Sequence, residues 1–169
     1  YVMWDTNEMI PVKNLEIKGS YSYSIAPDYA SDQGGVTDIP FADGDLMDRR
    51  SALDMKDADL SHELKHFGVG WNTAEPVTIE FDLGAAYELD RIWLLYARTL
   101  PQTTVEGLVD GNWASLGSHE GHVSPDRADY PTATIPLEGP PVQRLRMTFA
   151  GADEERRLVI PEIEIWAAE

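Results

Sequence analysis

The stretch VTIEFDL at residues 77–83 decides the fold of this chain. Its apolar and polar side chains alternate, which is the period of a β-strand with one face in a core and the other toward water. Similar runs, rich in β-branched and aromatic residues, follow in the rest of the sequence. They occupy residues 89–97, 104–109, 130–137, 142–149 and 158–166.

Two more segments complete this pattern. Residues 15–25 alternate Tyr and Ile with Ser, and residues 113–116 follow the turn-forming sequence Asp110-Gly111-Asn112. Short strands separated by Gly, Pro and Asp at intervals of about ten residues are typical of β-sandwiches and barrels. The sequence therefore predicts an all-β domain, most simply a β-sandwich.

Length and composition narrow the possible functions. A chain of 169 residues corresponds to one domain, and 43% hydrophobic residues suffice for a core. Thirteen basic against thirty acidic residues give a formal net charge of −17, which repels nucleic-acid phosphates and anionic lipids. The longest apolar run, residues 92–97, is much shorter than the roughly twenty residues that span a bilayer. We expect neither a nucleic-acid partner nor membrane insertion.

The absence of cysteine excludes disulfides, thiolate metal sites and a cysteine nucleophile. The sequence begins at Tyr1 and not at Met, which we interpret as a piece of a longer polypeptide. Residues 1–13 are expected to form a linker or extension, and residues 14–169 the folded domain.

Residues 26–70 lack the strand alternation and carry eight acidic side chains between positions 38 and 63. Four apolar residues between 53 and 67 fall near one face of a helix that Ser51 and Gly68 would cap. We expect a long acidic loop with a short helix, inserted between about residues 45 and 70. Such long excursions in small domains are usually functional or stabilised by an ion.

The sequence HELKH at residues 62–66 matches the H-E-x-x-H pattern of zinc hydrolases. However, Lys65 puts a cation inside the motif, and strands follow where a third ligand on a helix would be needed. The alternative is that His62 and His66 lie on the solvated side of a short helix, from which they could contact a ligand. We keep the zinc hydrolase as a lesser alternative.

The turn-like sequence FADGD at residues 41–45 offers the carboxylates of Asp43 and Asp45 to a hard cation such as Ca²⁺. The spacing is not that of a complete EF-hand loop, so other segments must supply ligands. Glu162 and Glu164, on one face of the predicted last strand, are candidates. A plain β-turn is the alternative interpretation.

Carbohydrate recognition would use aromatic rings and forked hydrogen-bond donors. We expect Trp93, Trp113 and Trp166 in the core, whereas Tyr130 lies near a predicted loop. Arg98 follows the apolar run at residues 92–97, where its guanidinium could hold adjacent hydroxyls. A salt bridge is the alternative role for Arg98 in so acidic a chain.

The order of several short motifs resembles the discoidin, or coagulation factor 5/8 type C, family. That family includes the bacterial family 32 carbohydrate-binding modules, which have a galactose-binding-like jelly-roll fold. The resemblance covers roughly residues 14–167, and its most specific parts are D-L-G after a strand and a later D-G-x-W turn. The matching segments are FADGD (41–45), GW (70–71), PVTIEFDLG (76–84), LDRIWL (89–94), VDGNW (109–113), RLR (144–146) and EIEI (162–165).

The resemblance implies a jelly-roll β-sandwich with a structural Ca²⁺ held by Asp43, Asp45 and Glu162. It also implies structural packing of Trp71 and Trp113, with a sugar bound by loops at one end of the sandwich. Arg98 falls where many such modules place a sugar-contacting arginine. The segment at residues 48–67 is longer than usual in the family.

We therefore expect a non-catalytic carbohydrate-binding module of a larger polysaccharide-active enzyme that is secreted, periplasmic or on the cell surface. Its partners would be a poly- or oligosaccharide and a catalytic domain in the same polypeptide. Another class of function, a protein-interaction or architectural module of the same fold, stays open. The candidate ligand contacts are Arg98, His66, His62, Tyr96, Arg49 and Tyr130.

Overall fold

The computed structural model describes residues 15–17, 19–30, 69–126, 131–151 and 158–168. Within these ranges the chain is built of β-strands and contains no helix. None of its described segments could cross a membrane as a helix. The strands are β1 (Leu15–Ile17), β2 (Ser20–Tyr23), β3 (Tyr29–Ala30), β4 (Val69–Trp71), β5 (Val77–Tyr87), β6 (Leu89–Leu95), β7 (Thr99–Leu100), β8 (Thr103–Val109), β9 (Asn112–His119), β10 (His122–Val123), β11 (Thr132–Pro136), β12 (Val142–Phe149), β13 (Leu158–Ile160) and β14 (Glu162–Ala167).

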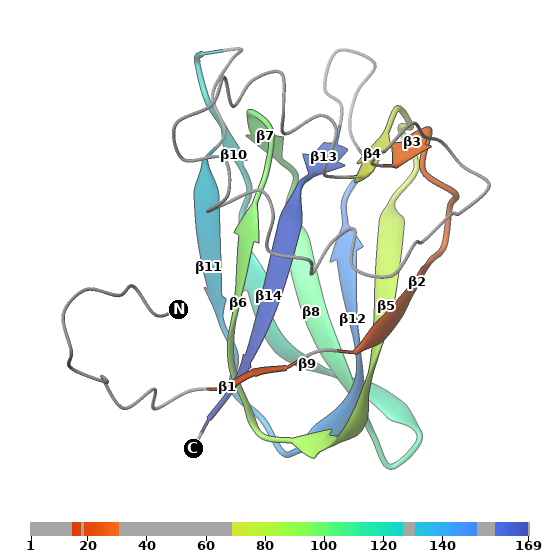
Figure 1. The fold of residues 1–169 in the computed structure, drawn as a ribbon, viewed down its shortest axis with the longest axis vertical. Helices are drawn as coiled ribbons and strands as arrows, with labels where there is room; N and C mark the ends of the chain where they lie inside the picture. The colour runs from red at the N-terminus through yellow and green to blue at the C-terminus, as the bar shows by residue number, and fades with distance from the viewer. Residues whose placement is uncertain (1–14, 18, 31–68, 127–130, 152–157, 169) are drawn as a thin grey trace, which may run out of the picture.

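Two antiparallel sheets form the body of the domain (Figure 1). One has the strand order β2-β5-β12-β8-β9 and the other β1-β14-β6-β11. Two smaller sheets, β13-β4-β3 and the ribbon β10-β7, lie together at one end of the body. At the opposite end β1 pairs with β14, where Leu15 faces Ala167.

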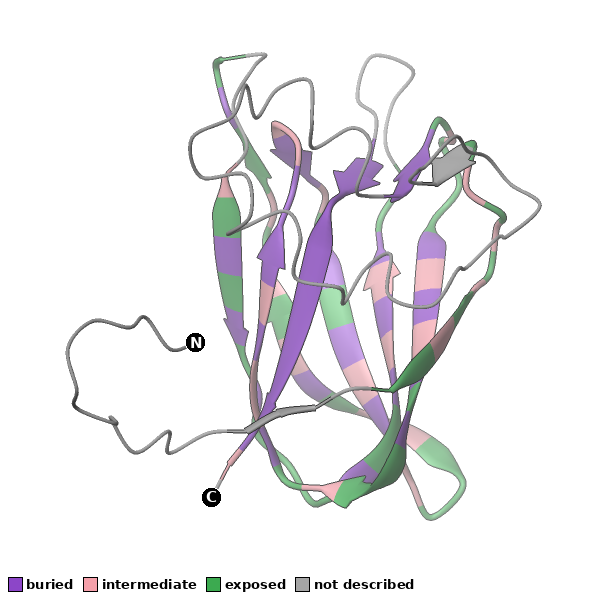
Figure 2. Ribbon diagram, in the orientation of Figure 1, coloured by how far each residue is buried: buried purple, intermediate pink, exposed green. Residues whose placement is uncertain are grey.

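The core lies between the two large sheets and is built as the alternation predicts. In β5 the side chains of Val77, Ile79, Phe81 and Leu83 are buried, whereas those between them are half-buried or exposed. Figure 2 shows the same alternation on the neighbouring strands. The buried cluster joins β5 and β12 of one sheet to β6 and β14 of the other, so the β-sandwich prediction is confirmed.

Two strands expected to be continuous are each divided where the chain changes sheets. The run at 158–166 is interrupted at Pro161, so that β13 pairs with β4 whereas β14 pairs with β6. Proline has no N–H to donate to a ladder and is suited to such a break. The run at 15–25 divides in the same way, because β1 pairs with β14 and β2 with β5.

The tryptophan predictions were only partly correct. Trp71 and Trp166 are buried, and Trp71 donates a hydrogen bond of 2.8 Å from Nε1 to the Ile25 carbonyl. Trp93 and Trp113 are only half-buried, because their side chains lie on the outer faces of the sheets. Arg146 covers one face of Trp113, with its guanidinium carbon 4.4 Å from the ring centre.

Candidate functional site

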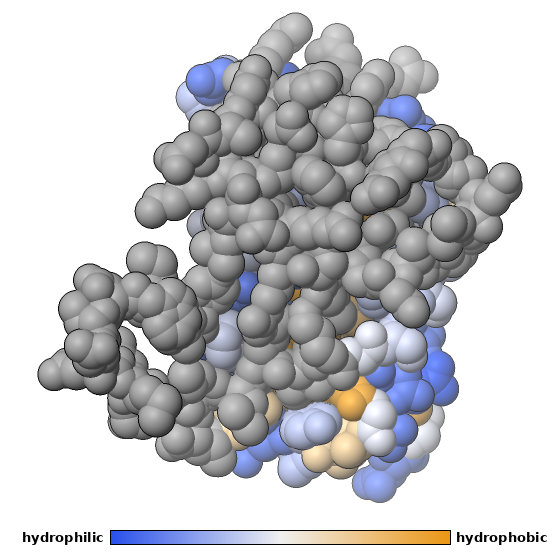
Figure 3. Space-filling model, viewed as in Figure 1, coloured by the Kyte–Doolittle hydropathy of each residue, from blue (hydrophilic) through white to orange (hydrophobic). Residues whose placement is uncertain are grey.

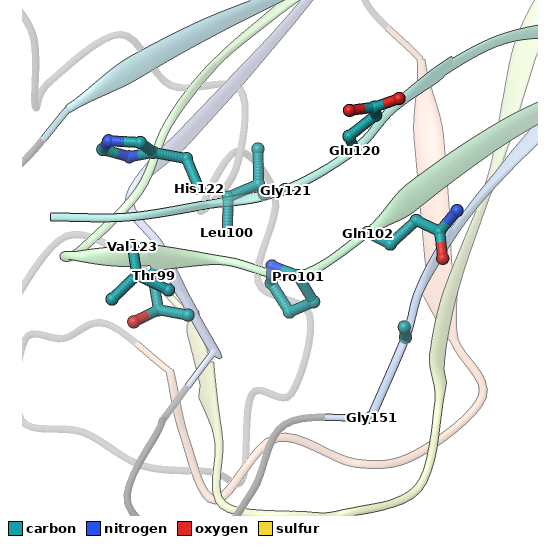
Figure 4. A pocket seen from close by; sticks show the side chains of 10 residues that line it. Thr99, Leu100, Pro101, Gln102, Glu120, Gly121, His122, Val123 and Gly151 are labelled. Carbon is teal, nitrogen blue, oxygen red and sulfur yellow. The ribbon is translucent and has the colours of Figure 1, made fainter.

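A pocket of about 470 Å³ opens at the end of the sandwich that carries the β7–β10 ribbon. It is bounded by three stretches of chain that are far apart in the sequence (Figure 4). Its described lining residues are Thr99, Leu100, Pro101, Gln102, Glu120, Gly121, His122, Val123, Ala150 and Gly151. The lining thus combines polar and apolar side chains.

The turn before β10 forms one wall, and its shape depends on Gly121. This residue has a φ of +97°, and a Cβ placed there would lie 2.9 Å from the carbonyl oxygen of Leu100. Only glycine fits such a close approach without moving the ribbon. The Gly121 N–H donates to Nδ1 of His119 over 2.9 Å, which holds the turn in place.

The wall formed by Ala150 and Gly151 is hydrogen-bonded to the segment between β7 and β8. The N–H of Ala150 donates to the Gln102 carbonyl over 2.8 Å, so the end of β12 stays beside the start of β8. Thr103 Oγ1 donates to the Pro101 carbonyl over 2.9 Å and supports the bend between β7 and β8. Hydrogen bonds to backbone groups therefore hold two walls of the pocket in place.

Tyr96 contributes to this end of the domain through its hydroxyl. The residue is only 2% exposed and belongs to the core, which leaves no ring face open for stacking. The hydroxyl oxygen lies 2.7 Å from Nδ1 of His122, and the two rings meet edge to face. This hydrogen bond orients the ring of His122, an exposed residue that lines the pocket.

Arg98 lies directly before the first lining residue and has a left-handed backbone conformation, with φ of 57°. Its carbonyl accepts a hydrogen bond of 2.9 Å from the Ser124 N–H. In return its Nε donates to the Ser124 carbonyl over 3.3 Å. The ion pairs between described residues do not include Arg98.

Glu162, the predicted calcium ligand on the last strand, is fully buried at the start of β14. It lies opposite Leu95 in the ladder, at the end of the sheet nearest the small strands. Burying a carboxylate is costly unless a positive group or several donors compensate its charge. Glu164, two residues on, accepts a hydrogen bond of 3.2 Å from Trp166 Nε1.

The other predicted site residues lie outside the described residues. These are Asp43, Asp45, Arg49, His62, His66 and Tyr130, together with Glu63 of the H-E-x-x-H sequence and the predicted helix. Within the described ranges, no three His, Asp or Glu side chains come together as a metal site.

The sequence reasoning missed Gln102, Glu120 and His122 as lining residues. The signal was the segment HEGH at 119–122, in which a glycine separates polar side chains directly after a strand. The described lining residues include no Phe, Tyr or Trp; their apolar members are Leu100, Pro101, Val123 and Ala150.

No family model matches the chain, and no curated protein matches it in sequence. The fold does match solved structures. One is "SpGH29", with a TM-score of 0.58 and 17% identity over 90% of this chain and 27% of the other. A second is truncated AlyQ, which has CBM32 and alginate lyase domains, with a TM-score of 0.57 and 12% identity over 92% and 34% of the two chains. This chain thus spans between a quarter and about a third of the length of those two.

A third match is to an isolated module. The family 32 carbohydrate-binding module of NanJ from C. perfringens, solved with galactose, has a TM-score of 0.53 at 10% identity. The match covers 90% of this chain and 98% of the module. The chain therefore has the β-sandwich fold of family 32 carbohydrate-binding modules, as the sequence motifs predicted.

Proposed function

We propose that this protein is a non-catalytic carbohydrate-binding module that takes a glycan at the end of the sandwich carrying the β7–β10 ribbon. The single observation that supports this most is the preformed pocket beside Arg98, at the loop end of a fold shared with glycan-binding modules. A shallow site of this kind binds weakly, because few contacts must offset ordering and desolvation. In a longer polypeptide, tethering would then raise the concentration of substrate near a catalytic domain.

The polar contacts of the proposed site come from both sides of the ribbon. Arg98 contributes guanidinium N–H groups to vicinal hydroxyls, and His122 contributes the ring edge that Tyr96 leaves free. Leu100, Pro101 and Val123 provide apolar surface for the C–H face of a sugar. Within the proposal, His62, His66, Arg49 and a stacking ring from Tyr130 complete the site.

A structural Ca²⁺ belongs to the same proposal. Asp43, Asp45 and Glu162 would hold it, because carboxylate oxygens are ligands that Ca²⁺ prefers. The ion would fix the acidic segment to the start of β14, at the end of the sandwich proposed to bind the glycan. A secreted, periplasmic or surface location suits both the glycan and the calcium.

The function is tested by probing the protein on an array of neutral and acidic glycans and measuring the affinity of the best ligand. Arg98→Ala should weaken binding roughly tenfold or more, because hydrogen bonds to charged groups contribute about 1.5–3 kcal/mol. Arg144→Ala is the matched control, since it removes a half-exposed arginine paired with Glu80 on the outer face of the five-stranded sheet. A silent array would contradict the proposal and favour a protein-interaction module.

The lesser alternative, a zinc hydrolase, has its own test. Protein prepared without chelators should contain no stoichiometric zinc if the module is non-catalytic. Bound zinc that is lost on His62→Ala would support the hydrolase instead, because that change removes one of the two motif imidazoles.

A further inference from the structure

The turn between β9 and β10 consists of Glu120 and Gly121, and both residues line the pocket (Figure 4). It connects the five-stranded sheet to the ribbon, in which His122 lies opposite Leu100. A hydrogen bond of 2.9 Å from the Gly121 N–H to Nδ1 of His119 spans the turn. The position of this wall therefore depends on a ring nitrogen that acts as an acceptor.

That hydrogen bond requires the neutral form of the His119 ring. A backbone N–H is always a donor, so Nδ1 must present its lone pair and the ring proton must be on Nε2. In the protonated ring Nδ1 also carries a hydrogen, and two donors then face each other. Imidazole is the side chain that takes up a proton between about pH 5 and 8. A modest fall in pH therefore breaks a bond that holds the turn.

Gly121 lies close to the segment that forms another part of the pocket. A Cβ placed on it would be 2.9 Å from the Leu100 carbonyl oxygen and 3.1 Å from the backbone nitrogen of Gln102. Two opposed donors at His119 displace Gly121 from this position, and the lining residues on either side of Gly121 are attached to it directly. Protonation of His119 therefore changes the shape of the pocket.

His122, the other described histidine at this end, responds to a proton differently. Its Nδ1 lies 2.7 Å from the Tyr96 hydroxyl, which can donate to the neutral ring or accept from the protonated one. This hydrogen bond therefore persists in both protonation states. Of the two described histidines, His119 is the one whose protonation removes a hydrogen bond that supports the pocket.

Charged groups from several elements surround His119. On β8 the residue opposite His119 is the uncharged Thr103, and Glu106 of the same strand is ion-paired with an arginine of β12. Residues 132–136 of β11, which also contacts β9, include no titratable side chain. Glu120 follows His119 in the turn, and Arg98 precedes β7. These groups act on the charge of the ring, whereas the need for an acceptor at Nδ1 is the same whatever their balance.

We propose that His119 is a positioning residue of the glycan site, and that its protonation weakens glycan binding. This inference rests on the proposed function and adds the regulation of that site. A bound glycan requires the turn in place, and its restoration then lacks the hydrogen bond that the proton removed. Affinity should therefore fall roughly three- to tenfold between about pH 7.5 and pH 5.5, the effect of one hydrogen bond.

Two substitutions separate the acceptor from the charge. His119→Asn keeps an acceptor, because the side-chain oxygen of asparagine accepts from the N–H two residues on, but it does not titrate. His119→Ala removes the acceptor at every pH. Any pH dependence that remains in His119→Asn measures the other three histidines of the chain, which the variant leaves in place.

The first measurement is the affinity of each variant for the neutral glycans of the array at about pH 7.5 and pH 5.5. Neutral glycans carry no titrating group, and melting curves at both pH values show that each variant is folded. The wild type should bind more weakly at the lower pH. His119→Asn should match the wild type at the higher pH and keep its affinity at the lower one, whereas His119→Ala should bind weakly at both.

The second measurement needs no glycan. In a pH titration of the free protein followed by NMR, the amide signal of Gly121 should shift with the same midpoint as the ring protons of His119. In His119→Asn the Gly121 signal should not show that transition. This measurement tests the hydrogen bond itself, independently of what the pocket binds.

Three results would overturn the inference: equal pH dependence of binding in the wild type and His119→Asn, wild-type affinity of His119→Ala at the higher pH, or a Gly121 amide that does not follow the ring of His119. The proposed function survives each of them if glycan binding still depends on Arg98. An array that is silent at both pH values would remove the proposed function and the regulation with it, while the Gly121 titration would still decide whether His119 holds the turn.

Discussion

Arg98 combines an unfavourable backbone conformation with a favourable position for its side chain. A left-handed conformation costs a residue with a Cβ roughly 1–2 kcal/mol, and such residues are frequent at functional sites. At Arg98 the cost is offset by the two hydrogen bonds that its backbone and side chain exchange with Ser124. Arg98 directly precedes Thr99, the first of the residues that line the pocket.

Two substitutions of Arg98 should therefore differ in stability but not in glycan binding. Arg98→Gly relieves the left-handed strain, whereas Arg98→Ala retains it, so the glycine variant should be more stable by roughly 1 kcal/mol. Both variants lack the guanidinium and should bind glycan equally poorly. Urea unfolding measures the first difference and glycan titration the second; an alanine variant as stable as the glycine variant would contradict the explanation.

The D-L-G sequence in β5 supports the pairing of β5 with β12. Asp82, in the D-L-G sequence, accepts hydrogen bonds from the Gly84 N–H over 2.9 Å and from Gln143 Nε2 over 3.1 Å. The pKa of Asp82 is held below its ordinary value, mainly by the hydrogen bond from the Gly84 N–H and next by that from Gln143. The charge of Arg144 also lowers this pKa, whereas burial of the carboxylate raises it. The ionised carboxylate therefore connects the two strands where β12 is irregular, between Val142 and Arg144.

The sign of the pH dependence follows from that lowered pKa. Because folding favours the ionised form, Asp82 stabilises the protein at neutral pH, and this contribution is lost as the pH falls through the carboxyl range. In Asp82→Asn the free energy of unfolding should therefore fall less steeply between about pH 5 and pH 2 than in the wild type. Denaturant unfolding across that range measures it, with the exposed Glu88→Gln as control. Parallel curves for Asp82→Asn and wild type would contradict the role of this carboxylate.

The long strands were predictable from the sequence because apolar residues alternate with polar ones where buried and exposed positions alternate. Segments such as β5 and β12 need only the period of two, and the Asp110-Gly111 turn needs only two residues that tolerate the positive φ of a type I′ hairpin. The strands β7 and β10 were missed because two residues carry no period. The pocket was missed with them, since it depends on backbone contacts such as that of Gly121 with Leu100.

At the scale of the whole molecule, the buried core lies between the two large sheets, and the described pocket lies at the end that carries the β7–β10 ribbon. Among the described residues, Val123 is the one large hydrophobic side chain that is exposed, at 43% of its surface. On the face seen in Figure 3 the coloured atoms are mostly hydrophilic, with a small apolar area near the end opposite the pocket. The described surface thus offers a polar pocket more readily than a broad apolar docking face.

The proposed Ca²⁺ should act on this whole-molecule stability. A ligand at a hundred times its Kd adds about 2.7 kcal/mol to the folded state, equivalent to roughly 5–10 °C in melting temperature for a domain of this size. Calcium should therefore raise the melting temperature of the wild-type protein, and a chelator should lower it. Glu162→Gln and Asp45→Ala should lose this response, whereas the exposed Glu138→Gln should keep it. Identical melting curves with calcium and with chelator would refute the calcium site.

The pairing of β1 with β14 brings the first and last described strands side by side, at the pole away from the pocket. Any polypeptide joined before β1 or after β14 would leave from this pole. A domain attached at this end would leave the pocket uncovered. The β-sandwich could then rotate relative to that domain about a single point of attachment. Under the proposed function, such an arrangement would keep the glycan site accessible beside a flanking catalytic domain.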